Sequence, residues 1–422
     1  MNQVSLDNAA QILGISPVTI KQWEKKKLIK SQKLSKVKKV FDLEELQLLK
    51  NQINITDVNN KYKILKSQEI TSFNVIELFA GCGGMALGLE NAGLKKELLV
   101  EIDENCINTL TINRPNWNIV RDDVVNLDFK EYRDRIDIVA GGFPCQAFSY
   151  AGHGKGFEDT RGTLFFEFAR CLSEVRPKIA IAENVRGLLS HQKGKTLEIM
   201  LTVLQDLGYD TAYQVLSAQF LDVPQKRERV IIIATRKDLE IRAIFPRERN
   251  YTIPLRDALK DCPSSQGVEY KTRKKEIMNL VPPGGNWRDL PVPIQKEYMK
   301  NSYYKGGGRT GFAKRLAWDE PALTVTCAPA QTQTERCHPE ETRPLTVREY
   351  ARIQTFPDDW QFIGSLSSRY RQIGNAVPVN MAYHLGRCLI AMLRQQNSDR
   401  PDLETLTKTP ISTQLAIPGL EF

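Results

Sequence analysis

Short apolar runs recur through the middle of the chain, each followed by glycine, an acidic residue or a polar turn. They lie at residues 74–79, 97–100, 118–120, 136–140, 179–182 and 230–233. Uninterrupted runs of this length are typical of strands that are buried inside a sheet. An amphipathic segment through Leu87 and Leu89 follows the first run and predicts a helix. The pattern therefore predicts an open α/β sheet.

The first fifty residues have a different pattern, with apolar positions at helical spacing. Leu6 to Leu13 form one such stretch and Gly14 ends it. Ser16 and Pro17 are then typical of an N-cap and a first helical position. Asp42 with Glu45 forms a capping-box pattern for a third helix. Two short helices around a glycine turn predict a helix-turn-helix.

Residues 21–39 hold nine lysines and one acid, which gives +8 of the chain's formal charge of +9. This exceeds what solubility requires. We therefore expect phosphate contacts to DNA from Lys21, Lys25 and Lys26. The alternative is a solvated basic face on a module used for dimerisation or packing. Residues 1–50 resemble the winged helix-turn-helix domains of the MerR and excisionase type, with residues 28–41 as the wing.

Composition indicates the number of domains, the cellular location and the redox state of the cysteines. The 422 residues are 41% apolar, enough for two or three domains. No apolar run could span a bilayer and the polar start lacks a signal peptide, so we expect a cytoplasmic protein without membrane contact. Eight cysteines without a CxxC pair indicate reduced thiols. Despite the adjacent Cys337 and His338, we predict no metal site.

One cysteine follows a predicted strand directly, in the run Gly-Gly-Phe-Pro-Cys-Gln-Ala-Phe-Ser at residues 141–149. Open α/β sheets present groups to ligands at this edge, so Cys145 is a candidate nucleophile. A buried cysteine that acts as a small apolar residue is the alternative. The run is similar to the catalytic motif of the DNA (cytosine-5) methyltransferases. Further motifs in that family's order extend the resemblance over roughly residues 74–395.

The resemblance implies a defined chemistry on a cytosine that is flipped out of the duplex. Cys145 as thiolate adds to carbon 6, which makes carbon 5 electron-rich. Glu183, in Ala-Glu-Asn-Val after a predicted strand, protonates or hydrogen-bonds the N3 edge. Arg227 and Arg229, in Gln-Lys-Arg-Glu-Arg, grip a phosphate and face the base. Residues 149–156 are expected to be a mobile lid. Helix capping for Glu183 and a surface charge run for the arginines are the alternatives.

The turn after the first strand is glycine-rich, and an acid follows about twenty residues later. From the residues alone a nicotinamide cofactor fits this as well, but the spacing Phe-x-Gly-x-Gly-Gly is not the dinucleotide one. The resemblance implies S-adenosylmethionine. Asp122 is expected to be a solvated turn residue beside its neighbour. The expected cofactor-binding residues are Phe79, Gly81, Gly83, Glu101, Asp123, Pro144, Asn375 and Val377.

From residue 238 to 340 the periodic pattern gives way to Pro-, Gly- and Arg-rich sequence. We expect a smaller, irregular target-recognition domain that reads base edges. The expected DNA contacts outside the N-terminal module are Gln225, Thr324 and Arg309. Arg315, Gln331, Gln333 and Arg336 are further candidates that the sequence does not sort. Thr346 and Glu349 form another capping box at the start of a helix.

The predicted architecture combines a Rossmann-like, S-adenosylmethionine-dependent methyltransferase sheet with two added domains. The boundaries are a helix-turn-helix at 1–50, a linker at 51–72, a catalytic domain at 74–237, recognition at 238–340, a return at 341–395 and a disordered tail at 396–422. We predict a sequence-specific methyltransferase acting on double-stranded DNA in a restriction-modification system, with a restriction endonuclease of the same specificity and autoregulation through residues 1–50. An RNA cytosine-5 methyltransferase and a transcriptional regulator remain the alternatives.

Overall fold

The computed structural model describes residues 3–13, 20, 24, 29–33, 39–47, 61–143, 164–304, 311–395 and 407–408. They form two compact units. The sheet unit comprises residues 64–223, 227–251 and those from 354 onward. The other unit combines residues 1–63 with residues 224–226 and 252–353; we call the latter two ranges the insert unit.

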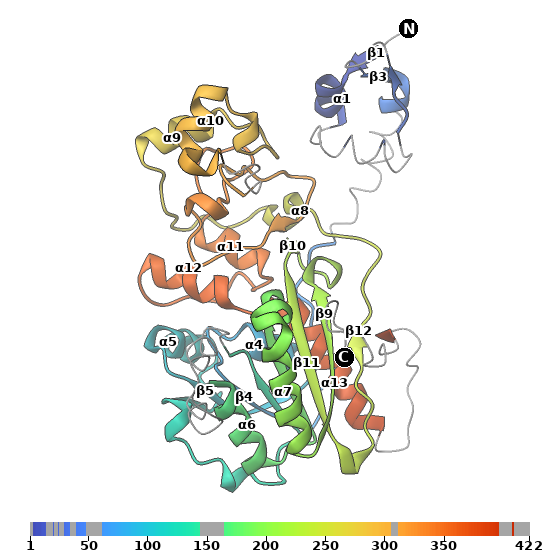
Figure 1. The fold of residues 1–422 in the computed structure, drawn as a ribbon, viewed down its shortest axis with the longest axis vertical. Helices are drawn as coiled ribbons and strands as arrows, with labels where there is room; N and C mark the ends of the chain where they lie inside the picture. Colours follow the sequence, from blue (N-terminus) through green and yellow to red (C-terminus); the bar gives the residue numbers. More distant parts are fainter. Residues whose placement is uncertain are drawn as a thin grey trace. The chain divides into compact units, whose positions relative to one another are not determined.

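The sheet unit is built on one seven-stranded sheet (Figure 1). Its strand order is β6-β5-β4-β7-β8-β11-β9. The strands are β4 (Asn74–Leu78), β5 (Lys95–Glu101), β6 (Ile119–Arg121), β7 (Ile138–Gly141), β8 (Ile179–Val185), β9 (Tyr209–Ser217) and β11 (Glu228–Arg236). The first five pair in parallel, whereas β11 runs antiparallel to both β8 and β9. The predicted open α/β sheet is confirmed, and β9 is the strand that the apolar runs did not indicate.

Helices cover both faces of this sheet and close two apolar cores. The helices of the sheet unit are α4 (Gly84–Ala92), α5 (Glu104–Asn113), α6 (Leu164–Val175), α7 (Lys195–Asp206), α12 (Leu366–Asn375) and α13 (Val379–Gln395). Of these, α4 and α13 contribute to one core, and α6 and α7 to the other. Alternation along β4 sends Val75 to the core shared with α4 and α13 and Ile76 to the core shared with α6 and α7. A Cβ on Gly88 of α4 would lie 2.4 Å from the Cβ of Ala382. Glycine therefore permits the close approach of α4 to α13.

The insert unit has short elements around its own small core, which includes Tyr270, Met278 and Trp287. Its helices are α8 (Leu255–Leu259), α9 (Thr272–Asn279), α10 (Val292–Met299) and α11 (Val347–Ile353). β10 (Gln225–Lys226) pairs in parallel with β13 (Ala322–Leu323). The main segment of this unit, residues 252–353, begins and ends about thirteen residues later than the expected recognition domain, since β12 (Phe245–Pro246) packs in the sheet unit and α11 packs on α8.

Short 3-10 helices join many of these elements. They are η1 (Val124–Asn126), η2 (Lys130–Tyr132), η5 (Arg186–Gly194), η6 (Ala218–Phe220), η7 (Lys237–Leu239), η8 (Trp287–Asp289), η9 (Lys300–Ser302) and η10 (Thr332–Thr334).

The N-terminal residues form a three-stranded antiparallel sheet beside α1 (Leu6–Leu13). Its strands are β1 (Gln3–Ser5), β2 (Gln32–Lys33) and β3 (Lys39–Asp42). β2 and β3 form a hairpin inside the segment expected as the wing. Asp42 Oδ1 accepts the N–H groups of Glu44 and Glu45, and residues 43–47 are helical, as the capping box predicts. Of the predicted second helix the structure describes Ile20, which is helical and fully buried in the N-terminal core. Lys21, Lys25 and Lys26 lie outside the described residues.

The expected linker is firmly attached in its described part, residues 61–72. Leu65 N–H donates to Asn380 Oδ1 at 2.9 Å, and Thr71 N–H donates to the carbonyl of Gly93 at 2.8 Å. Glu69 pairs with Arg387 at 2.7 Å. Residues 64–72 therefore belong to the folded sheet unit.

In the tail, β14 (Thr407–Lys408) pairs with β12, and the remainder of 396–422 lies outside the described residues. No helix among the described residues is long and apolar enough to cross a membrane. None of the seven described cysteines forms a disulfide.

Candidate functional site

A cavity of about 840 Å³ lies at the carboxyl edge of the central strands of the sheet unit. It is lined by the turns after β4, β5, β7 and β8, by the start of β11 and by the segment between α12 and α13. Open α/β sheets bind their ligands in this position. The cavity is therefore the candidate active site.

The glycine-rich turn after β4 forms one wall. Phe79, Gly81 and Gly83 all have positive φ, at 59°, 55° and 87°. A Cβ on Gly84 would lie 2.2 Å from the carbonyl oxygen of Val377, so glycine is required for this close contact. Gly83 precedes α4 without a side-chain cap. The first turn of α4 therefore directs backbone amides toward the cavity, and the amide of Ala86 hydrogen-bonds to the buried Glu77 carboxylate; such a helix end favours negative charge.

Acidic side chains form the next wall. Glu101, at the end of β5, accepts the N–H groups of Gly81, Ile102 and Asp103 at 2.7 to 2.9 Å. Asp123 caps η1 through the N–H of Val125. Its neighbour Asp122 accepts from the N–H of Asp123 and from the amide of Asn126, which fits the expected turn role. Glu101 and Asp123 both line the cavity, as a cofactor site requires.

The segment that carries Asn375 and Val377 is held by two buried side chains. Gln354 Nε2 donates to the carbonyls of Ile373 and Ala376 at 2.7 and 2.9 Å. Arg227 Nη2 donates to the carbonyls of Gly374 and Ala376, both at 3.1 Å. Arg227 is 1% exposed. The expected phosphate contact of Arg227 is thus not what the structure gives, because its guanidinium is turned inward onto backbone carbonyls.

Glu183 and Arg229 meet inside the cavity from adjacent antiparallel strands. Arg229 Nε lies 2.6 Å from Glu183 Oε1, and the two side chains are only 12% and 10% exposed. An ion pair this sheltered is less weakened by solvent than a surface pair. The structure thus brings together the two polar residues that the resemblance assigns to the base.

The chain enters the catalytic motif beside Glu183. Asn184 Nδ2 donates to the carbonyl of Phe143 at 2.9 Å, and a Cβ on Gly142 would lie 3.4 Å from Glu183 Oε2. Phe143 packs against aromatic side chains of α6. The backbone two residues before Cys145 is therefore fixed next to the carboxylate. Cys145, Pro144 and the expected lid lie outside the described residues.

Sequence reasoning missed Glu77 of β4, which is 2% exposed and lines the same cavity. Burial raises the pKa of Glu77 and lowers the pKa of nearby Lys96, whose Nζ is buried, while their opposite charges counteract both shifts. An acidic residue inside an apolar strand run was the available signal. Gln354 was also missed, and its partners lie about twenty residues away along the chain.

In the insert unit most of the expected DNA contacts are turned inward. Gln225 is fully buried and its Oε1 accepts the N–H of Val325 at 2.9 Å. Thr324 Oγ1 donates to the carbonyl of Lys226 at 2.7 Å. Arg315 and Arg336 are 3% and 5% exposed and donate to backbone carbonyls. These partners favour structural roles for Gln225, Arg315 and Arg336, in place of the expected DNA contacts; Arg309 lies outside the described residues.

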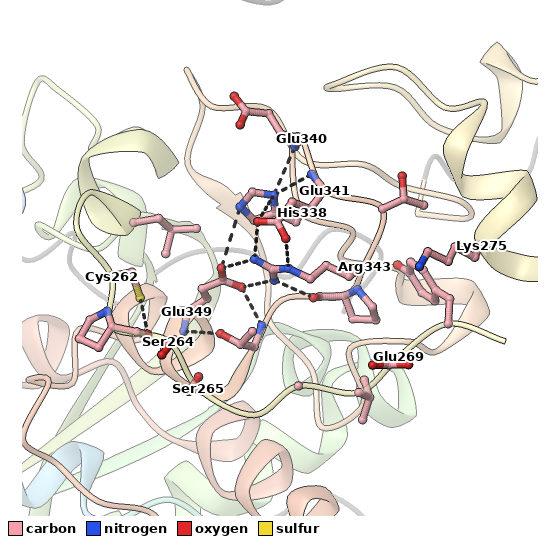
Figure 2. A pocket seen from close by; sticks show the side chains of 18 of the residues that line it. Cys262, Ser264, Ser265, Glu269, Lys275, His338, Glu340, Glu341, Arg343 and Glu349 are labelled. Atoms are coloured by element: carbon pink, nitrogen blue, oxygen red, sulfur yellow. Dashed lines mark hydrogen bonds and ion pairs between the residues drawn. The ribbon is translucent and has the colours of Figure 1, made fainter. Parts of the chain in front are cut away.

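A second cavity, of about 730 Å³, lies within the insert unit (Figure 2). Arg343 donates to the carboxylates of Glu341 and Glu349 at 2.8 to 3.0 Å. His338 Nδ1 accepts the N–H groups of Glu340 and Glu341. Burial would raise the pKa of Glu349, but Arg343 holds it below its usual range. The charges that Figure 2 shows at the centre are satisfied by one another, so this network stabilises residues 338–349.

Comparison with known proteins shows which family, relatives and solved structures the chain is similar to. Residues 73–391 match the family model of C-5 cytosine-specific DNA methylases. The chain is 53% identical over 415 residues to the type II methyltransferase M.Eco47II of Escherichia coli, covering 94% of this chain and 97% of that protein. It is 52% identical over 334 residues to M.Sau96I of Staphylococcus aureus, covering 77% of each. A solved Escherichia coli structure, described as a prophage-encoded DNA modification methyltransferase, superposes with a TM-score of 0.55 at 25% identity, covering 76% of this chain and all of that one.

Proposed function

The chain belongs to the C-5 cytosine-specific DNA methylase family, and on this premise we propose how its own residues carry out the transfer. The protein is a sequence-specific DNA (cytosine-5) methyltransferase of the restriction-modification type. The observation that carries the proposal is the sheltered Glu183–Arg229 pair beside the entry to the Cys145 motif.

S-adenosylmethionine is the proposed methyl donor, and the cavity of the sheet unit fits it. The glycine turn and α4 would receive its carboxylate, while Glu101 and Asp123 would accept hydrogen bonds from its ribose and adenine. Asn375 and Val377 would complete the wall. When bound, the donor supplies an electrophilic methyl group. The buried carboxylate of Glu77 would provide negative charge for a cationic ligand.

The reaction starts on the flipped cytosine. The Cys145 thiolate forms a bond to carbon 6, and the electron pair of the carbon 5–carbon 6 double bond moves toward carbon 5. Glu183 takes up a proton from solvent and transfers it to N3, where negative charge would otherwise build up, and the carboxylate that remains pairs with Arg229. Arg229 fixes the orientation of the Glu183 carboxylate through their 2.6 Å contact. Once carbon 5 carries the methyl group, a water molecule takes the carbon 5 proton; its electron pair restores the carbon 5–carbon 6 double bond, the carbon 6–sulfur bond breaks to release the Cys145 thiolate, and N3 returns its proton to Glu183.

Bisulfite sequencing of plasmid DNA from expressing cells tests this chemistry. Wild type should protect cytosines within one recurring motif, and Cys145→Ala should protect none although it folds. Cys262→Ala, at a partly exposed cysteine of the insert unit, is the matched control and should protect like wild type. Protection by Cys145→Ala would contradict the proposed nucleophile. Protection of no DNA by wild type, with methylation of a structured RNA, would favour the RNA alternative.

A regulatory role for residues 1–50 is the second proposal. The β2–β3 hairpin and the capped third helix support a winged helix-turn-helix, and residues 21–39 concentrate the basic charge. Such a module would bind an operator near its own gene. Deleting residues 1–60 should abolish binding to upstream DNA in a mobility-shift assay and leave methylation intact. Unchanged upstream binding after the deletion would refute the regulatory role.

A further inference from the structure

One loop of the insert unit, residues 326–334, presents exposed polar side chains on a fixed backbone. We propose that this recognition loop reads base edges in the target DNA and that Gln333, together with Gln331, determines sequence specificity. The inference rests on the proposed function, since it assigns the readout of the same DNA substrate. Four observations support it.

The two ends of the recognition loop are tied together. The hydroxyls of Thr326 and Thr334 lie 3.5 Å apart. Arg336, just beyond the loop, donates through Nε and Nη2 to the carbonyl of Thr324, at 2.9 and 2.7 Å. Its backbone N–H donates to the carbonyl of Pro329. The buried guanidinium thus closes the neck of the loop.

A buried cluster of charged side chains fixes the backbone of the recognition loop. Lys274 Nζ donates to the carbonyl of Ala330 at 2.5 Å and pairs with Glu335 Oε2 at 2.7 Å. Glu335 is fully buried and also accepts the hydroxyl of Tyr298 at 3.0 Å. Removing one partner of such a buried pair is costly. The cluster therefore keeps the backbone from Ala330 to Glu335 in one position.

Gly311 packs directly under the loop. Glu335 N–H donates to the Gly311 carbonyl at 3.1 Å, and a Cβ on Gly311 would lie 2.7 Å from the carbonyl oxygen of Gln333. The backbone at Gln333 is thus set by a contact that only glycine permits. Side chains held on a fixed backbone lose little entropy on binding, which favours selective recognition.

The chemistry of the tip fits base readout. Cys327, Ala328, Gln331, Thr332 and Gln333 are exposed, whereas the flanking positions 325, 329, 335 and 336 are buried. The Gln333 carboxamide has no hydrogen-bond partner among the described residues. Gln331 Oε1 accepts the hydroxyl of Thr334 at 3.4 Å. A carboxamide offers both a donor and an acceptor, so it can hydrogen-bond with the donors and acceptors that base edges present in the major groove.

The structure also separates these glutamines from the other candidates. Gln225, Arg315 and Arg336 are buried and bound to backbone groups. Their loss would disturb the fold of the insert unit instead of relaxing one base position. Gln331 and Gln333 remain as exposed members of the candidate set in the described part of the chain.

The test uses the full chain and duplexes in which each position of the wild-type motif is varied in turn. Gln333→Ala should lose about 5- to 150-fold in the ratio of kcat/KM between the correct base pair and a wrong one, at one position only. Gln331→Ala should do the same at the same or a neighbouring position. Gln205→Ala, an exposed glutamine on α7 of the sheet unit, is the matched control and should keep the wild-type ratios.

A footprint on the wild-type protein tests the same proposal without any variant, so it gives a result even if a variant fails to fold. Alkylation of Cys327 by iodoacetamide, followed by peptide mass spectrometry on wild type, should slow on addition of the cognate duplex. Unchanged ratios in both folded variants, or unchanged Cys327 alkylation, would overturn the proposal. Failure of the proposed function differs from both results, because wild type would then methylate no duplex at all.

Discussion

Asp222 gives the sharpest stability prediction in the sheet unit. It is 3% exposed, and its φ of 56° lies in the left-handed region. Its carboxylate accepts His384 Nε2 at 2.8 Å, Arg249 Nε at 3.2 Å and the hydroxyl of Tyr251. Its carbonyl accepts Asn380 Nδ2 at 2.7 Å. Asp222 therefore joins α13 to the segments on both sides of β11.

The neighbouring Asn380 extends this anchor. Its Oδ1 accepts the N–H of Leu65, and its own N–H donates to Thr355 Oγ1, both at 2.9 Å. Leu65, Asp222, Tyr251 and Thr355 each lie within two residues of a point where the chain passes between the two units. These four residues are all bonded to Asn380 or His384 of α13, Tyr251 through the carboxylate of Asp222.

The size of the effect follows from the bonds that each substitution removes. Asp222→Asn keeps a residue type that tolerates the left-handed conformation and keeps one acceptor, so we expect a loss of about 1.5–3 kcal/mol, the value of one hydrogen bond to a charged group. Asp222→Ala leaves the His384 and Tyr251 donors without an acceptor and should cost about 3–5 kcal/mol. In a domain of this size the larger loss lowers Tm by about 6–20 °C.

The pH dependence of this stability loss shows whether the charge of the Asp222 carboxylate is its cause. Burial alone would raise the pKa of Asp222, but hydrogen bonds from His384 and Tyr251 hold it well below its usual range. A carboxyl with a lowered folded-state pKa contributes stability above its unfolded pKa, about 3.9, and loses it as pH falls through the folded value. The deficit of Asp222→Asn should therefore be constant above about pH 5 and shrink at lower pH.

Urea unfolding of wild type and Asp222→Asn across this pH range measures the difference. Asp128→Asn is the control, since this exposed carboxylate pairs with Lys130 Nζ at 3.4 Å and accepts the Lys130 N–H at 2.9 Å, a bond that asparagine can also accept. The substitution should change stability by less than about 0.5 kcal/mol. A deficit no larger than that of the control, or one that stays constant down to the lowest pH at which the protein folds, would refute the reasoning.

Three further predictions concern the site and the chain's start. Glu183→Gln should lower kcat by about 10²- to 10⁴-fold, measured by tritiated methyl transfer, because it removes the group that delivers a proton to N3. Near-normal kcat would contradict its role. Gly84→Ala should weaken S-adenosylmethionine binding, measured by calorimetry, because its Cβ would lie 2.2 Å from the Val377 carbonyl oxygen. Unchanged affinity would contradict the assignment of the glycine-rich turn to the cofactor site. Deleting residues 1–60 should leave the Tm of the sheet unit unchanged, whereas deleting residues 1–66 should lower it by removing an amide bound to α13; equal Tm values would disprove that attachment.

The strands could be predicted from sequence because their signal is local. The six apolar runs all became strands, and the capping boxes at Asp42 and Thr346 both begin helices. β9 escaped because it is an edge strand whose side chains are mostly half-buried, so its pattern is not continuously apolar. A strand's apolar content depends on how many of its faces are covered.

The roles of individual polar residues could not be predicted in the same way. Arg227 and Arg229 are two positions apart, yet the first binds carbonyls 147 and 149 residues later and the second meets Glu183 on β8. Gln225 likewise finds its partner 100 residues later. A buried polar group is stable only when such a partner is supplied.

The sequence by itself determined the sheet, the order of the catalytic motifs and the chemical class of the protein, because each depends on short patterns of apolar, glycine and acidic residues. The tertiary structure alone decided which glutamines and arginines are exposed and which are internal. That choice depends on contacts between residues far apart in the chain, and only folding brings those residues together.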